Sequence, residues 1–146
     1  MTIEAFTTFS EGTLQPADIA EALMPYAKRY LSQATVNDLQ SVIDGEVAGE
    51  DFDDSLYNAF FELEGHIPPY CLIGSHPGDG ACLGVWPDVG LALVDVRDGD
   101  LLQVSDTGDI PPDHVGLVLH VNDHGNVTLW EQVPGDSELV EHWAVV

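Results

Sequence analysis

Positively charged side chains are almost absent from this sequence. Its only lysine and arginines are Lys28, Arg29 and Arg97, against 26 aspartates and glutamates, and the formal net charge is -23 at pH 7. Proteins that bind DNA or RNA neutralise phosphates with clusters of lysine and arginine, and one adjacent pair is not such a cluster. We therefore expect no direct contact with nucleic acid.

The same scarcity disfavours enzymes that handle phosphates. A P-loop needs a Gly-Lys-Ser/Thr segment, and none occurs. Some nuclease sites place a lysine beside paired carboxylates. No such site can lie in the chain after Lys28, because no lysine follows it. A clamp on a phosphorylated substrate is equally short of cations.

Long apolar runs are missing as well. The segment that follows Met1 has no basic start, so we expect neither a secretion signal nor a membrane span. We therefore expect a cytosolic location and no membrane partner. Cysteine is scarce too. Cys71 and Cys82 are interpreted as free buried thiols in a reducing compartment, since a chain of this size needs no disulfide.

Apolar residues, by contrast, suffice for a core. They make up 45% of 146 residues, a length that fits one domain. The hydrophobic period changes from helical to strand-like near residue 66. The sequence therefore predicts a single α+β domain spanning 1–146, with a helical part at about 1–66 packed on a C-terminal antiparallel β-meander at about 67–146.

Two helical stretches are expected before residue 50. Pro16 suits the first helical position, and Pro25 is expected to split the following stripe into two short pieces. Thr35-Val-Asn-Asp38 resembles a capping box, and the apolar stripe after it ends near Gly49.

A third helix is expected to start at three aspartates and to end at Gly65. Negative charge at Asp51, Asp53 and Asp54 suits the helix dipole. The residues assigned to its buried face are Phe52, Leu56, Tyr57, Phe60 and Phe61.

Strand-like patterns follow His66-Ile-Pro-Pro69. The expected strands are Ala81 to Trp86, Val89 to Val96, Leu101 to Val104, Val115 to Val121, Asn126 to Glu131 and Leu139 to Val145. Asp98-Gly99 and Asn122 to Gly125 are interpreted as hairpin turns, and Pro134-Gly-Asp136 as a third connection.

Three segments of this half resemble small acidic proteins predicted in phages, prophages and plasmids. They are Gly74-Ser-His-Pro-Gly-Asp-Gly-Ala81, Gly84-Val-Trp-Pro-Asp88 and His120-Val-Asn-Asp-His-Gly-Asn-Val-Thr-Leu-Trp130. The resemblance covers about the last half of the chain. It implies an origin in a mobile element and carries over no catalytic residue.

Histidine and aspartate are dense near one hairpin and suggest a metal-dependent hydrolase that uses His120, Asp123 and His124. The wider set comprises Asp109, Asp113, His114 and His142. Imidazole and carboxylate are ligands of zinc and non-haem iron. Strand alternation sets His120 beside Val118 and leaves His124 in the turn, which favours ordinary turn chemistry. We therefore expect no metal, no cofactor and no enzymatic activity.

Cys71, His76 and Asp79 could form a nucleophile, a base and an orienting group. However, Cys71 has apolar sequence neighbours, which raise a thiol pKa instead of lowering it. Residues 74–80 are interpreted as a glycine-rich loop with a turn at Asp79-Gly80.

Three explanations compete for the acidity itself. If the acidity is an adaptation to high salt, the protein should need molar salt to fold. If it serves solubility alone, a net charge with a magnitude of about 2 to 8 would be enough, and -23 exceeds it. The third explanation is imitation of the DNA backbone. Since duplex DNA carries one charge per ~1.7 Å, 23 charges match roughly 39 Å of duplex. A compact chain of this length has a diameter near ~38 Å.

The favoured function is therefore that of an acidic inhibitor from a mobile element, an anti-defence protein that occupies the nucleic-acid-binding site of a basic host protein such as a restriction or CRISPR-type enzyme. One alternative is an immunity protein or antitoxin that neutralises one basic toxin, and the other is the metal-dependent hydrolase described above. The expected contact surface consists of Asp44, Glu46, Glu50, Asp51, Asp53, Asp54, Glu62 and Glu64, with Trp130, Trp143 or Tyr57 as candidate exposed anchors. An isologous dimer would extend this charged face, although nothing in the sequence requires it.

Overall fold

The computed structural model describes residues 2–47, 50–134 and 138–146. The chain divides into two compact units, each of which combines helices with strands. Unit 1 comprises Met1–Ile67 and Leu72–Trp86, and unit 2 comprises Pro68–Cys71 and Pro87–Val146. The expected α+β class is confirmed, while folding as a single domain stays a prediction.

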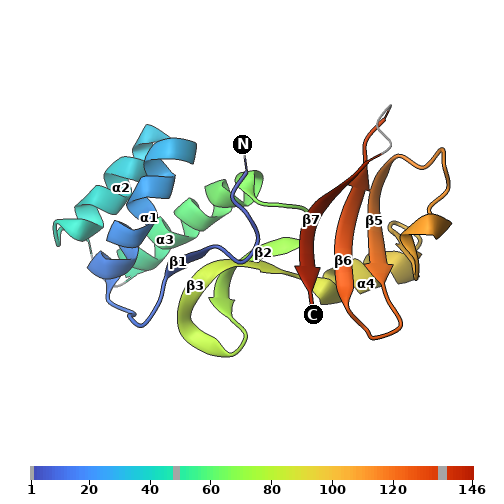
Figure 1. Cartoon of the computed structure of the whole chain (residues 1–146). Helices are drawn as coiled ribbons and strands as arrows, with labels where there is room; N and C mark the ends of the chain where they lie inside the picture. Colours follow the sequence, from blue (N-terminus) through green and yellow to red (C-terminus); the bar gives the residue numbers. More distant parts are fainter. Residues whose placement is uncertain (1, 48–49, 135–137) are drawn as a thin grey trace. The chain divides into compact units, whose positions relative to one another are not determined.

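Unit 1 combines a helical layer with a small sheet (Figure 1). Its described helices are α1 (Pro16–Tyr30), α2 (Gln33–Ile43), α3 (Glu50–Leu63) and the short 3-10 helix η1 (Glu64–His66). Its strands are β1 (Thr8–Ser10), β2 (Cys71–His76) and β3 (Asp79–Pro87), in the sheet order β1-β3-β2. Strand β1 pairs antiparallel with β3 and sets Thr8 opposite Gly84.

The expected break at Pro25 does not occur, because α1 continues through it. Proline removes the hydrogen bond to the carbonyl four residues earlier. Glu21 and Pro25 are both exposed, so water can reach the carbonyl that is left without a bond. Ile19, Leu23 and Ala27 fill the buried side of the same helix.

Helix α2 begins two residues before the expected capping box. Ser32 is the N-cap, and its Oγ accepts from the amide of Thr35. Thr35 is buried on this helix, and the apolar stripe stops at Ile43. The start of α3 at Glu50 and the end of its helical turns at His66 agree closely with the sequence pattern.

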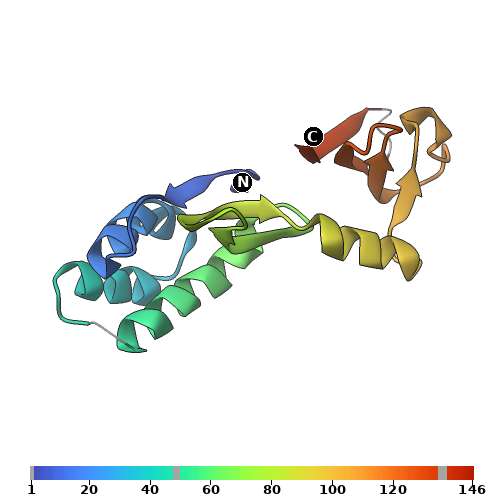
Figure 2. The ribbon, with the colours of Figure 1, turned by 90° about the horizontal axis from the view of Figure 1, so that it is seen from below.

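In the described part of unit 2, one α-helix is followed by a mixed sheet (Figure 2). Its described elements are α4 (Val89–Arg97), β4 (Leu102–Val104), the 3-10 helix η2 (Thr107–Asp109), β5 (Gly116–Val121), β6 (Val127–Gln132) and β7 (Leu139–Val145). The sheet order is β4-β5-β6-β7. Strands β5, β6 and β7 form the expected antiparallel meander, whereas β4 pairs parallel with β5.

The strand expected at Val89 to Val96 is a helix. Asp88 caps it, since its carboxylate accepts from the amide of Leu91 at 3.1 Å, and Gly99 follows the helix with a φ of 85°. A capping aspartate and a left-handed glycine are helix-end signals. Asp98-Gly99 is therefore the C-terminal end of α4, and the interpretation as a hairpin turn was wrong.

The segment 74–80 is mostly strand. Strand β2 ends at His76 and β3 starts at Asp79, so the turn lies at Pro77-Gly78 and not at Asp79-Gly80. The hairpin turn at Asn122 to Gly125 is confirmed, because the side chain of Asn122 accepts from the amides of His124 and Asn126. Of the connection expected at Pro134-Gly-Asp136, residues 135 and 136 lie outside the described residues.

Each unit has its own buried core. Leu23, Leu39 and Leu63 are fully buried in unit 1, and Val118 and Leu129 in unit 2. Burial of this kind, at about 25 cal/mol per Å² of apolar surface, is the main stabilising contribution in each unit. None of the helices in the described ranges has the length and apolar character that a membrane crossing needs.

Candidate partner-binding surface

The eight carboxylates of the expected contact surface separate into two groups. Asp44 directly follows α2, and Glu50 opens α3, so six of the eight lie around the connection between these helices. The other two lie at the opposite end of α3. Glu62 follows Asp54 by eight residues, which is about 12 Å along a helix. All eight side chains are exposed except that of Glu62, which is half-buried.

Helix α3 presents one outward face that combines carboxylates with aromatic rings. Its residues turn by about 100° each, which sets Glu50, Asp53, Asp54, Tyr57 and Phe61 within one arc of about 100°. All five side chains are exposed. We call this set, together with Glu64 one turn further on, the α3 acidic-aromatic face.

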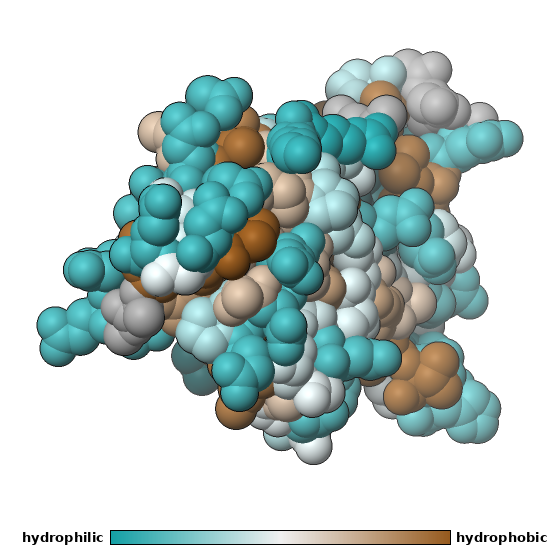
Figure 3. All heavy atoms as spheres, turned by 90° about the vertical axis from the view of Figure 1, so that its left-hand side faces the viewer, coloured by the Kyte–Doolittle hydropathy of each residue, from teal (hydrophilic) through white to brown (hydrophobic). Residues whose placement is uncertain are grey.

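Tyr57 and Phe61 are the apolar centre of this face. Tyr57 is 69% exposed and Phe61 65%, and their rings stack with centroids 6.5 Å apart. The expectation that both belong to the buried side of α3 was therefore wrong. The expected burial of Phe52 is confirmed, and Ala59 and Leu63 lie on the buried side with it. The helical side of unit 1 in Figure 3 shows hydrophobic patches between hydrophilic residues.

The other two candidate anchors are less accessible. Trp143 is 3% exposed, and its indole nitrogen donates to the carbonyl of Pro69 at 2.9 Å, so it belongs to the core of unit 2. Trp130 is half-buried, and its indole nitrogen has no hydrogen-bond partner among the described atoms. Of these three candidate anchors, only Tyr57 is exposed.

Glu62 has a structural role that the sequence did not indicate. Its carboxylate accepts from the Ser32 hydroxyl at 2.8 Å and from the Ser32 amide at 3.2 Å. Because Ser32 is the N-cap of α2, this contact joins the start of α2 to the end of α3. Burial raises the pKa of Glu62, but hydrogen bonds from Ser32 and Thr35 outweigh it, and the pKa is lowered from its usual value.

Changing Glu62 to glutamine should reduce stability by about 1 kcal/mol near neutral pH, the usual contribution of a helix cap. A carboxylate with a lowered folded-state pKa stabilises the protein above its unfolded-state pKa, and that stability is lost as pH falls through the folded value. Urea denaturation of wild type and E62Q should therefore differ at pH 7, and the difference should shrink as the pH falls below the ordinary glutamate pKa of 4.5. A difference that persists unchanged at pH 3 would contradict the assignment.

Carboxylates are not restricted to the helical unit. Unit 1 carries 14 aspartates and glutamates and unit 2 carries 12. Two of those in unit 2, Asp88 and Asp106, accept backbone amides at helix starts. What distinguishes the α3 acidic-aromatic face is therefore the exposed aromatic pair beside its carboxylates, and not acidity alone.

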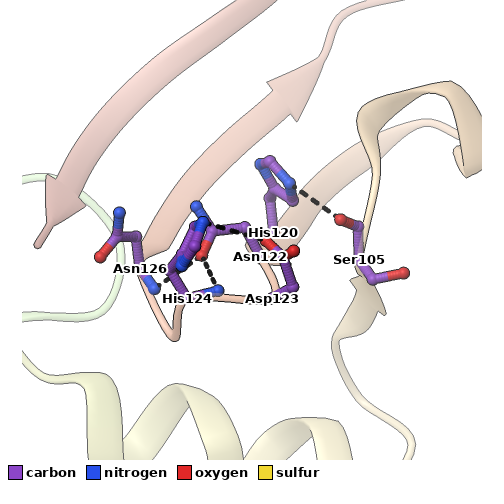
Figure 4. Close-up of polar contacts among 6 residues, drawn as sticks. All are labelled: Ser105, His120, Asn122, Asp123, His124 and Asn126. Atoms are coloured by element: carbon purple, nitrogen blue, oxygen red, sulfur yellow. Dashed lines mark hydrogen bonds and ion pairs between the residues drawn. The ribbon is translucent and has the colours of Figure 1, made fainter.

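The histidines near the β5–β6 hairpin have separate partners (Figure 4). His120 bonds through Nε2 to the carbonyl of Ser105 at 3.2 Å. His124 is exposed, and its nearest carboxylate is that of Asp123 at 3.8 Å. Within the described ranges, no three or more histidine, cysteine, aspartate or glutamate side chains form a group that could hold a metal ion.

His142, which belongs to the wider set of histidines and aspartates, lies in β7. Its Nε2 bonds to the carboxylate of Glu131 on β6 at 2.7 Å. The register of these strands shifts at Leu129/Trp130, which places His142 at a β-bulge. His142 is thus part of the sheet contacts and lies apart from the hairpin histidines in sequence and register.

Among the described residues, none lowers the pKa of the candidate nucleophile Cys71. Burial, with a smaller contribution from Asp88, raises the pKa of the Cys71 thiol to about 12. Cys71 and His76 occupy opposite ends of β2. His76 accepts from the Gly78 amide through Nδ1 and packs edge-on against Trp86. Both Cys71 and Cys82 are free thiols.

No protein-family model, curated protein or solved structure matches the chain. The function of the α3 acidic-aromatic face must therefore be inferred from its own residues. They offer negative charge and flat apolar rings on one rigid helix. A partner side chain that pairs with the carboxylates and also packs on the rings is a lysine or, above all, an arginine.

Proposed function

We propose that this chain is an acidic binding protein that occupies the nucleic-acid-binding site of a basic host protein by imitating the DNA backbone. In this role it acts as an anti-defence protein of a mobile element in the cytoplasm of the host, against a restriction or CRISPR-type enzyme. The observation that supports the proposal is the α3 acidic-aromatic face, where exposed carboxylates surround the stacked Tyr57 and Phe61.

Charge alone would give attraction without a defined orientation. Carboxylates held close together on α3 repel one another and destabilise the compact state, a cost that a basic partner offsets. Long-range attraction raises the association rate and weakens as ionic strength rises. Tyr57 and Phe61 supply the apolar contact that holds one orientation, because arginine stacks on aromatic rings while its charge meets the neighbouring carboxylates.

A cognate immunity protein or antitoxin would share this chemistry but differ in competition. A protein that imitates DNA is released from its target by duplex DNA, since both occupy one site. An antitoxin bound to a toxin that lacks a nucleic-acid site would not be released. Competition with DNA therefore separates the two functions.

The decisive experiment captures binding proteins from a bacterial host lysate and then tests each for nucleic-acid binding. We expect the captured protein to be basic, to lose DNA binding when the chain is added, and to be released by duplex DNA. The combined variant D51N/D53N/D54N removes three charges from the α3 acidic-aromatic face or its edge. It should weaken capture about tenfold or more, in the range of charged contacts at interfaces.

A matched control removes the same charge elsewhere. D100N/D109N/D113N changes three exposed aspartates of unit 2 and should keep most of the capture. Equal loss from both variants would show that net charge alone drives binding. Capture that survives D51N/D53N/D54N, or a partner that still binds DNA in the complex, would refute the proposal.

A further inference from the structure

The rings and carboxylates of the α3 acidic-aromatic face follow a fixed order along the helix. Asp53 and Asp54 lie one turn before Tyr57, and Glu64 lies one turn after Phe61. The three residues between the two rings carry no charge. The rings are therefore neighbours on this side of α3, and each has a carboxylate one turn away at its outer end.

This order suits the two separate surfaces of a guanidinium group. Its flat face stacks on an aromatic ring, while the N–H groups around its edge donate to a carboxylate. The ammonium group of lysine is compact and strongly hydrated, so it gains less from an aromatic ring that is mostly exposed to water. A ring with a carboxylate one turn away therefore favours arginine over lysine.

The distance between the rings sets the spacing of two such cations. The centroids of Tyr57 and Phe61 are 6.5 Å apart and their planes make an angle of 21°, so two guanidinium groups stacked on them would lie nearly parallel. Side chains three or four residues apart on a helix have Cβ atoms about 5–6 Å apart, close to this separation. Side chains two residues apart point to different sides of a helix and could not cover both rings.

We infer that the α3 acidic-aromatic face binds two arginines that lie one turn apart on a helix of its partner, and that Tyr57 and Phe61 select arginine over lysine. The inference rests on the proposed function, because helices that enter the major groove of DNA commonly contact guanine through arginine. It adds a requirement that net charge alone does not impose. A partner helix with lysines in place of these arginines is bound less tightly.

Titration of the full chain with synthetic helical peptides tests the inference, followed by NMR through the backbone amides of α3. All peptides are alanine-rich and have the same net charge. The first carries two arginines four residues apart, the second two lysines at the same positions, and the third two arginines two residues apart. We expect the first to bind about fivefold or more tightly than either of the others, the combined effect of two cation–π contacts at exposed sites.

Variants of the chain separate the effect of the rings from that of the charges. Y57A/F61A should bind the first two peptides equally, whereas Y57F keeps both rings and should keep the preference for arginine. The control D109N/D113N removes two exposed carboxylates of unit 2 and should also keep that preference. Circular dichroism checks that all three variants keep the fold.

Equal affinity of the wild-type chain for the arginine and lysine peptides would overturn the inference. So would equal affinity for the two arginine peptides, or a preference for arginine that Y57A/F61A retains. Peptides that shift no amide of α3 at up to about 5 mM would overturn it as well.

These failures differ from a failure of the proposed function. If a basic host protein is captured and released by DNA while the peptides show no preference, the proposed function stands and the selection of arginine is wrong. If the chain prefers the first peptide but captures no DNA-binding protein, the selection of arginine stands and the proposed function is wrong.

Discussion

Alanine at both Tyr57 and Phe61 is expected to lower the affinity for the captured basic partner by about thirtyfold or more while leaving the fold unchanged. Aromatic anchors at the centre of an interface typically cost about 2 kcal/mol or more when truncated. Both rings are mostly exposed, so their removal leaves no cavity in the core of unit 1. The loss therefore reports contact with the partner and not unfolding.

The measurement is the dissociation constant of Y57A/F61A at several salt concentrations. Because no charge changes, the variant should keep the slope of log affinity against log salt, with every value shifted downward. D51N/D53N/D54N should instead reduce that slope. The control L14A removes a leucine that is 68% exposed on unit 1, and it should bind as wild type does.

A reduced slope in Y57A/F61A, or an affinity within twofold of wild type, would contradict the role given to the aromatic pair. In that case acidity alone would account for binding, and the α3 acidic-aromatic face would not differ from other acidic surfaces of the chain. The exposed rings would then have no function in the proposed complex.

Periodicity predicted most elements, because their apolar residues recur with the spacing of one buried side. Helix α3 and the strands β5, β6 and β7 agree with the expected segments within two residues. A strand was predicted in place of helix α4, because its valines and leucines follow one another with few polar residues between them, as in a buried strand. The signals that could have corrected this were Asp88 before the run and Gly99 after it.

Strand β2 was missed for a different reason. Glycine, serine and proline in 74–80 are typical of loops, and β2 is held by pairing with β3, which residue composition does not report. The parallel pairing of β4 with β5 is equally invisible in the sequence. It depends on the path of residues 105–115 between the two strands.

The candidate site was predicted as a list of carboxylates and not as a surface. Exposure of seven of the eight followed from their charge, whereas the bond of Glu62 to Ser32 joins residues 30 positions apart, which no local pattern reports. The exposure of Phe61 was within reach, because it shares a helical arc with Glu50 and Asp54. Aromatic residues are usually buried, and that tendency prevailed in the sequence interpretation.

Changing Gly84 to alanine is expected to destabilise unit 1 by about 3 kcal/mol or more, in the range of severe overpacking. A Cβ at this position would collide with the carbonyl oxygen of Thr7 and lie 2.9 Å from the Trp86 ring and 3.1 Å from the Thr8 Cα. Strand β1 would have to move away from β3. The hydrogen bond from the Val85 amide to the Thr7 carbonyl, now 2.8 Å, would be lost.

Loss of this pairing also affects the helices of unit 1. Phe9 on β1 is 7% exposed and packs edge-on against Tyr26 of α1, with ring centroids 4.7 Å apart. Urea denaturation followed by circular dichroism measures the change. G80A is the matched control in the same strand, because a Cβ there meets nothing within 4 Å, and its stability should stay within about 0.5 kcal/mol of wild type. If G84A were as stable as G80A, β1 could not be paired against Gly84, and the support that β1 gives to the helices would have to come from elsewhere.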